Sequence, residues 1–365
     1  MAATETHARI PTLAPPASSG SAAIWRRVDE LVLRAPGEAA LREHGVHLLG
    51  AKRLREVGRP VSAELEADGW TAAILTLVAP VLLERVREAC DGPLVLMKGP
   101  EMATRYPQPE LRGFRDVDLL VPDAPAVQRQ LIAAGFEPIG VPEKYAAIHH
   151  LRPLVYPGLP LLVEIHDRPK WPARLRPPSK KDLLQTAVPS SVGVDGIDTL
   201  DPARHALVLA AHACAHGPLT KLVHALDLAL LADETPADEL RALARWWQME
   251  RLWQTSTSIA GSLFGNARTP VALRVWGRCL PRVRERTVLE RHLEDCLAPF
   301  WVYPGRDAAR ASLTALADEV RPLDGETWRD KARRAARAIR NAFAPLSDHR
   351  RELEQPADDH DRRPQ

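Results

Sequence analysis

A block of strand-like segments, enclosed by helical sequence on both sides, constrains the fold of this chain most strongly. Residues 22–90 have the apolar spacing of helices, and the helical pattern returns from about residue 180. Between them, short apolar runs bounded by Gly and Pro predict strands, and a short helix is expected at 125–134. The order strand, helix, strand, helix, strand, strand, strand predicts an α+β fold with a small mixed sheet, flanking helices and a C-terminal helical region.

The boundaries of these elements follow from Gly and Pro punctuation and from helix-start signals. The expected strands cover residues 94–97, 116–121, 136–139, 154–156 and 161–165. The expected later helices cover residues 201–216, 219–231, 236–259, 304–320 and 328–343.

The two ends of the chain have a different composition from the middle. Residues 1–21 are rich in Ala, Pro and Ser and lack the features of a signal peptide, so we expect a disordered tail. Residues 347–365 are charged and almost without apolar residues, which also predicts disorder. No apolar stretch is expected to approach the roughly 20 residues of a membrane span, so no membrane partner is expected.

Charge and cysteine content narrow the class of protein. The net charge of +2 among 365 residues does not indicate bulk nucleic-acid binding, although a local basic groove for RNA stays open. The four cysteines are far apart and show no metal-ligand spacing. They are interpreted as reduced thiols of a cytoplasmic protein.

Three carboxylates stand out within the strand block. Asp116 and Asp118 flank Val117 on one predicted strand, so both carboxylates point to the same face. Two adjacent carboxylates repel each other unless a cation lies between them, and Mg²⁺ prefers carboxylate oxygens plus substrate phosphates. Glu164, in an apolar strand with His166 on the same face, is the candidate for a third ligand of a two-metal site. A solvated strand end and a strand with one polar face are the alternatives.

Basic residues and a glycine precede this acidic pair. Lys98 and Gly99 end the first predicted strand, where Gly allows close approach of a phosphate and Lys98 offers a mobile charge. Arg112 and Arg115 could neutralise charge on a triphosphate. An ordinary turn with a solvated lysine, and arginines paired with nearby carboxylates, are the structural alternatives.

A histidine pair lies on a later predicted helix. His212 and His216 are spaced i and i+4, which places them on one helix face and would allow a zinc pair. No Glu follows His212, so the metalloprotease motif is absent. Helix packing is the alternative for these histidines.

These residues together resemble a known family. The pattern comprises Lys98-Gly99, Tyr106-Pro107, Arg112, Asp116-Val117-Asp118 followed by Leu-Leu-Val, and Glu164-Ile165-His166. It resembles the uncharacterised nucleotidyltransferase family of the DNA polymerase β-like superfamily over roughly residues 25–260. Most of that superfamily ends the first strand in Gly-Ser, whereas this branch and this sequence have Lys-Gly.

The resemblance implies transfer of a nucleoside monophosphate from a nucleoside triphosphate, with ATP as the default donor, to a hydroxyl-type acceptor. It implies Mg²⁺ or Mn²⁺ held by Asp116, Asp118 and Glu164, with phosphate-side elements at Lys98, Gly99 and Arg112. His166, together with His212 and Asp227 of the helical region, would shape an acceptor pocket. The acceptor could be a small molecule, a peptide or protein, or RNA.

The resemblance also suggests a division of the chain. A nucleotidyltransferase domain with N-terminal helices is expected over residues 22–175, and a helical domain over residues 176–346. A non-catalytic nucleotide-binding or scaffold protein with the same fold is the alternative to an enzyme.

Overall fold

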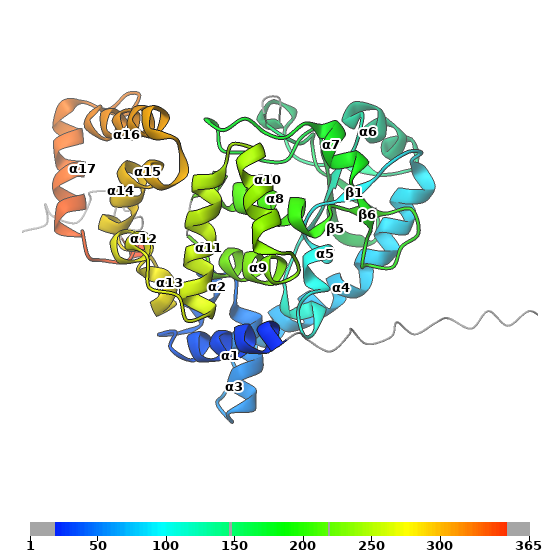
Figure 1. Cartoon of the computed structure of the whole chain (residues 1–365), viewed down its shortest axis with the longest axis horizontal. Helices are drawn as coiled ribbons and strands as arrows, with labels where there is room; N and C mark the ends of the chain where they lie inside the picture. The colour runs from blue at the N-terminus through cyan, green and yellow to red at the C-terminus, as the bar shows by residue number, and fades with distance from the viewer. Residues whose placement is uncertain (1–18, 146–147, 218–219, 349–365) are drawn as a thin grey trace, which may run out of the picture.

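The computed structural model describes residues 19–145, 148–217 and 220–348 and contains a mixed seven-stranded sheet (Figure 1). Its spatial order is β3-β4-β5-β2-β1-β7-β6. The strands are β1 (Val95–Leu96), β2 (Asp116–Leu120), β3 (Glu137–Pro138), β4 (Leu154–Tyr156), β5 (Leu159–His166), β6 (Val188–Pro189) and β7 (Asp198–Thr199). The predicted α+β class with a mixed sheet and a C-terminal helical region is confirmed.

Strand direction changes across the sheet. The central β2 runs antiparallel to β1 and parallel to β5. On the outer side of β5, β4 and then β3 are added in antiparallel fashion. On the other side, β7 is parallel to β1 and β6 is antiparallel to β7. A parallel pair requires a long crossover, and the chain between β2 and β5 includes α6 (Ala124–Ala133).

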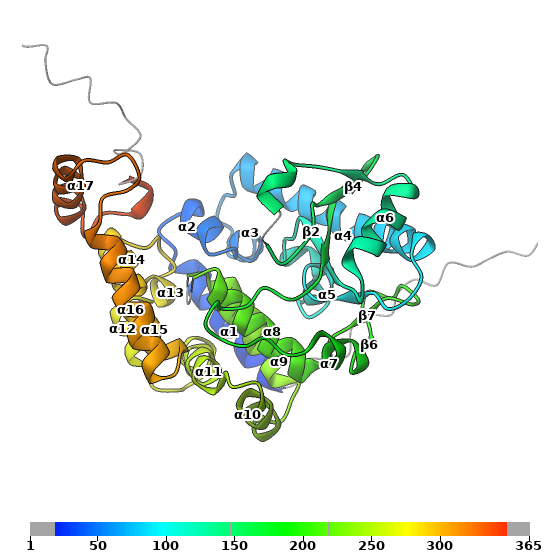
Figure 2. The same cartoon turned by 90° about the horizontal axis from the view of Figure 1, so that it is seen from above.

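Side-chain alternation sends the two faces of the sheet into separate cores. Leu96 and Val117 pack with α4 (Ala63–Ala89) and α6 on one face. Val95, Met97 and Leu120 pack with α8 (Pro202–Ala215) on the other. Figure 2 shows α4 and α6 on the far side of the sheet from α8 and α9 (Leu222–Asp233). Asp116 and Asp118 alternate with Val117 and therefore lie on the α8 face.

The remaining helices form the N-terminal, connecting and C-terminal parts. Before α4 come α1 (Ser19–Leu33), α2 (Glu38–Glu43) and α3 (His47–Glu56). Short connecting helices are α5 (Pro100–Ala103), η1 (Pro109–Leu111), η2 (Pro142–Tyr145) and α7 (Lys180–Gln185). After α9 follow α10 (Ala237–Trp246), α11 (Glu250–Phe264), α12 (Val271–Val275), α13 (Cys279–Arg282), α14 (Val288–Leu297), α15 (Pro299–Val302), α16 (Gly305–Val320) and α17 (Trp328–Arg340).

Several expected boundaries are corrected. The single helix expected over 236–259 is two helices, because Gln248 adopts the left-handed φ of 55° between α10 and α11. Strands β6 and β7 lie in the stretch expected to be helical, and as two-residue strands they carry no periodicity. Helix α1 begins at Ser19, inside the expected tail. The rest of that tail, and residues 349–365 of the other, lie outside the described residues.

Helix α4 corrects the expectation that no apolar stretch approaches the length of a membrane span. By length and composition alone it could cross a membrane. Its apolar residues run around the whole helix. Leu75, Leu82 and Leu83 are buried against the sheet, whereas Trp70 and Leu77 are 72% and 75% exposed.

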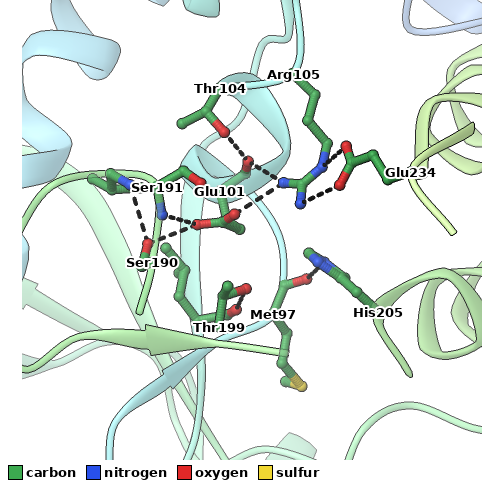
Figure 3. A network of polar contacts seen from close by, with 11 residues as sticks. Met97, Glu101, Thr104, Arg105, Ser190, Ser191, Thr199, His205 and Glu234 are labelled. Atoms are coloured by element: carbon green, nitrogen blue, oxygen red, sulfur yellow. Dashed lines mark hydrogen bonds and ion pairs between the residues drawn. The ribbon is translucent and has the colours of Figure 1, made fainter. Parts of the chain in front are cut away.

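A buried ionic network fastens α5 to its surroundings (Figure 3). The fully buried Glu101 accepts hydrogen bonds from Ser190 Oγ at 2.6 Å and from the Ser191 backbone N–H at 3.1 Å. Its other oxygen pairs with Arg105 Nη1 at 2.9 Å. Arg105 in turn contacts Glu234, just after α9, through Nε at 2.7 Å. The segment that follows β1 is thereby tied to both β6 and α9.

We expect Glu101→Ala to lower the free energy of unfolding by about 3 kcal/mol, because it leaves a buried guanidinium and two donors without their carboxylate. Glu234→Ala, at the 37% exposed end of the same network, should cost about 1 kcal/mol or less. Chemical denaturation of both variants measures the difference. Equal losses would contradict a dominant role for the buried carboxylate.

Candidate active site at the edge of the sheet

The turn after β1 depends on Gly99. Its φ of 60° and ψ of −117° are unfavourable for residues with a side chain. A Cβ at this position would come within 2.6 Å of the Asp116 carbonyl oxygen. Gly99 therefore lets the turn lie directly against the start of β2, and it places Lys98 beside the carboxylates.

Strand pairing brings the predicted carboxylates together. In the parallel pair of β2 and β5, Asp118 is opposite Glu164, and Asp116 is opposite Leu162. Residues opposite each other in a parallel pair project to the same side, so Asp118 and Glu164 share the α8 face with Asp116. Asp118 is fully buried, and the Glu164 side chain is 18% exposed.

Two basic groups converge on Asp118. Lys98 Nζ lies 2.9 Å from Asp118 Oδ1, and His166 Nε2 lies 2.9 Å from the same oxygen. His166 Nε2 is also 3.6 Å from Glu164 Oε2. The other oxygen, Asp118 Oδ2, is buried without a hydrogen-bond partner among the described residues. A buried carboxylate oxygen without a partner is costly unless a further ligand completes it.

The pKa values of the two aspartates are shifted in opposite directions. Burial and the neighbouring Asp118 carboxylate raise the pKa of Asp116 to about 6. Although burial opposes ionisation of Asp118, the Lys98 ammonium and the His166 hydrogen bond hold its pKa below the usual value. Hydrogen bonds to Asp118 and Glu164 outweigh burial and raise the pKa of His166. Asp118 is thus a permanent anion, whereas Asp116 binds a proton more readily.

Asp118, Glu164 and His166 form a group that could hold a metal ion, since their ligand atoms all lie within 4.8 Å of one another. Asp116 is outside that group in the described structure, although it interacts electrostatically with both other carboxylates. The donor set suits a divalent cation, because carboxylate oxygens are supplemented by an imidazole.

Two histidines missed as site residues extend this group. His150 Nε2 lies 3.6 Å from Glu164 Oε2. The rings of His149, His150 and His166 are mutually adjacent, with centroids 4.9–5.3 Å apart. The His-His pair was visible in the sequence, but its position beside Glu164 depends on the bridge between His150 and His166.

Arg112 is engaged by a carboxylate from the helical region. Its Nη2 donates to Asp227 Oδ2 at 2.8 Å and its Nε to Asp227 Oδ1 at 3.0 Å. Tyr106 Oη donates to the same carboxylate at 2.7 Å. Arg112 and Asp227, assigned separately from the sequence, therefore form one buried pair between η1 and α9. Arg115 is exposed and lines a different cleft, with His47 and Asp68.

A cleft of about 170 Å³ lies above Asp116 and Asp118, whereas Glu164 and His166 are not among the residues that line it. Asp116, Asp118, Lys98 and Gly99 line one side, and His212, His224 and Asp227 line the other. His212 Nε2 is 3.4 Å from Lys98 Nζ. His224 was not expected from the sequence, although it precedes Asp227 by three residues, a spacing that places both side chains on one face of α9.

Replacing Asp227 by Asn should lower the free energy of unfolding by about 2–3 kcal/mol, because the buried Arg112 loses its counter-charge. Asp238→Asn, at an exposed position of α10, is the matched control and should have almost no effect. Thermal and denaturant unfolding of the two variants provide the measurement. A stable Asp227→Asn protein would show that Arg112 does not need its partner.

A proton on Asp116 competes with a bound cation, and the raised pKa gives this competition a defined pH range. Wild-type protein should bind Mn²⁺ more tightly than Asp116→Asn above pH 7. That advantage should shrink by up to about tenfold per pH unit below pH 6, as Asp116 gains its proton. Calorimetric titration at several pH values tests this, and a ratio of affinities independent of pH would contradict it.

Comparison with known protein families finds a match for this chain. No curated protein and no solved structure matches the chain. A family model described as uncharacterised nucleotidyltransferase matches residues 39–265, which include the sheet, the carboxylates and helices α8 to α11. Since the match covers more than half of the chain, this protein belongs to the uncharacterised nucleotidyltransferase family.

Proposed function

We propose that the protein transfers a nucleoside monophosphate from a nucleoside triphosphate to a hydroxyl-type acceptor and releases pyrophosphate. The observation that carries this proposal is the register of β2 and β5, which sets Asp118 opposite Glu164 with Asp116 on the same face. Family membership supports the reaction class. ATP is taken as the donor. The compartment is taken to be a reducing cytoplasm, since all four cysteines are free.

Asp116, Asp118 and Glu164 would hold Mg²⁺ or Mn²⁺, with His166 beside them. The partnerless Asp118 Oδ2 fits this assignment, because it offers a buried anionic oxygen to a ligand. A divalent cation bound there would polarise the phosphoryl oxygens and neutralise the charge that develops on them.

The basic residues would orient the triphosphate. Lys98 is 20% exposed and projects into the cleft, so its ammonium can move from Asp118 to a phosphate oxygen. Because Gly99 has no side chain, a phosphate can also approach the backbone next to Lys98. Arg112 is fixed by Asp227, so we assign it a fixed positive charge at the cleft rather than a mobile contact.

The acceptor hydroxyl would attack the α-phosphorus in line with the departing pyrophosphate. A new bond forms between the acceptor oxygen and phosphorus, and the bond to the bridging oxygen of the β-phosphate breaks. Pyrophosphate leaves with the electron pair, and Glu164 takes the proton of the hydroxyl. Positioning and electrostatic stabilisation supply most of the rate in phosphoryl chemistry of this kind.

A non-catalytic nucleotide-binding protein is the second candidate. It is favoured by one observation, namely that Lys98 and His166 already neutralise Asp118 without any added cation. Such a protein would bind nucleotide but would not release pyrophosphate.

Pyrophosphate release from each of the four nucleoside triphosphates, with Mg²⁺ or Mn²⁺ and a protein-free cell filtrate as the source of acceptors, tests the proposal. We expect Asp116→Asn/Asp118→Asn to reduce release by at least about a hundredfold. Asp167→Asn, an exposed carboxylate just beyond β5 that pairs with Lys180, is the control and should retain activity.

Binding of an α,β-methylene triphosphate, which cannot be cleaved at the relevant bond, separates the two candidates. Binding without any pyrophosphate release would support the non-catalytic protein. Failure to bind the analogue would contradict both.

A further inference from the structure

A second cavity lies directly behind the carboxylate cleft, among α8, α9 and α11. Ala213 and His224 line both the cleft and this cavity. Along α9, His224 belongs to both, Asp227 belongs to the cleft, and Ala225 belongs to the cavity. The two spaces are therefore adjacent, and they share wall residues near the ends of two helices that also carry site residues.

Small side chains at the helix contacts create this space. Ala210, Ala213 and Ala225 line it from α8 and α9, where larger residues would close it. The rest of the lining is mostly apolar and bulky, with Leu252, Ile259 and Trp276 among its residues, and it also includes Thr255 and Ser256 of α11. The cavity measures about 30 Å³, which is room for a group of about two to three heavy atoms.

Two buried polar atoms on the lining residues lack partners. Within the described parts of the chain, neither His224 Nδ1 nor the Trp276 indole Nε1 makes a hydrogen bond. Trp276 is only 1% exposed, so water does not replace the missing partner easily. Burial lowers the pKa of His224 to about 3, which keeps its imidazole neutral and able to accept as well as donate. A mostly apolar void whose lining residues carry such atoms suits a group that is apolar but has an oxygen at one end.

We propose that this cavity is the acceptor-specificity pocket, and that it takes a short aliphatic group next to the hydroxyl that receives the nucleotide. The proposal rests on the proposed function. His224 is then a positioning residue that hydrogen-bonds the acceptor at the junction of the two spaces. Lys221 is the one cationic residue on the described pocket wall, so an aliphatic acceptor fits better than a nucleic-acid end.

The first experiment measures binding in the pocket and does not require catalysis. Xenon binds apolar voids, and its ¹²⁹Xe NMR shift should report a saturable site in the wild type. Ala225→Leu fills the pocket from α9 and should abolish that site, as should Ser256→Leu from α11. Ala232→Leu, a partly buried position of α9 that does not line the pocket, is the control and should keep it. Melting temperatures establish that each variant is folded.

The same xenon signal tests the chemistry of the occupant. At equal concentration, 1,2-butanediol should displace xenon, whereas glycerol should not, because its third hydroxyl would be buried in an apolar space. Equal displacement by both compounds, or a xenon site that survives both filling variants, would overturn the proposal.

The second experiment supplies ethylene glycol, 1,2-propanediol and 1,2-butanediol as acceptors for transfer from radiolabelled nucleoside triphosphate. Each added methylene should raise kcat/KM by about fourfold in the wild type and in Ala232→Leu. The dependence should disappear in Ala225→Leu, while the KM for the triphosphate stays unchanged. Transfer that is independent of tail length would overturn the assignment of the pocket to the acceptor. Diol binding without transfer to any diol would leave the pocket standing as a binding site but would count against the proposed function.

Discussion

The parallel pairing of β2 with β5 is the contact on which the site depends. It joins an aspartate and a glutamate that are 46 residues apart in the sequence and sets their side chains on the same face. A shift of one residue in this register would turn Glu164 into the α4 core and bring Val163 or Ile165 to the site, because side chains alternate. The register is held by the apolar residues next to the acids in the two strands, since Val117 and Val163 are fully buried.

Lys98 and His166 compensate part of the charge on Asp118. A fully buried carboxylate has a large desolvation cost, which Lys98 and His166 offset through one of its oxygens. The second oxygen has no partner among the described residues, so the compensation is incomplete. Burial and the neighbouring Asp118 carboxylate raise the pKa of Asp116, and the charges of Lys98 and Arg112 offset them only in part. The site is thus stable enough to fold and still favours a further positive charge.

Local pattern was enough to predict the central strands and the carboxylates. The alternation in Asp116-Val117-Asp118 fixed which side chains share a face, and the apolar flanks of Glu164 marked it as unusual. Contacts between distant segments could not be predicted. Arg112 and Asp227 are 115 residues apart, and nothing in their local sequences shows that they form a pair. Strands of two residues, such as β7, have no period to detect, and the left-handed turn at Gln248 interrupts a pattern that otherwise continues as one helix.

The helical region is more than a support for the sheet, because α8 and α9 supply one side of the cleft. Asp227 reaches from α9 to Arg112 beside β2, and Glu234, just after the same helix, reaches Arg105 beside α5. These two ion pairs fix α9 against the segment that carries Lys98 and Gly99. Any movement of α9 would therefore change both the position of His224 and the charges around the carboxylates. In the proposed reaction, α9 would contact the acceptor through His224 and is tied by these ion pairs to the segment proposed to bind the triphosphate, which favours the alignment that in-line transfer requires.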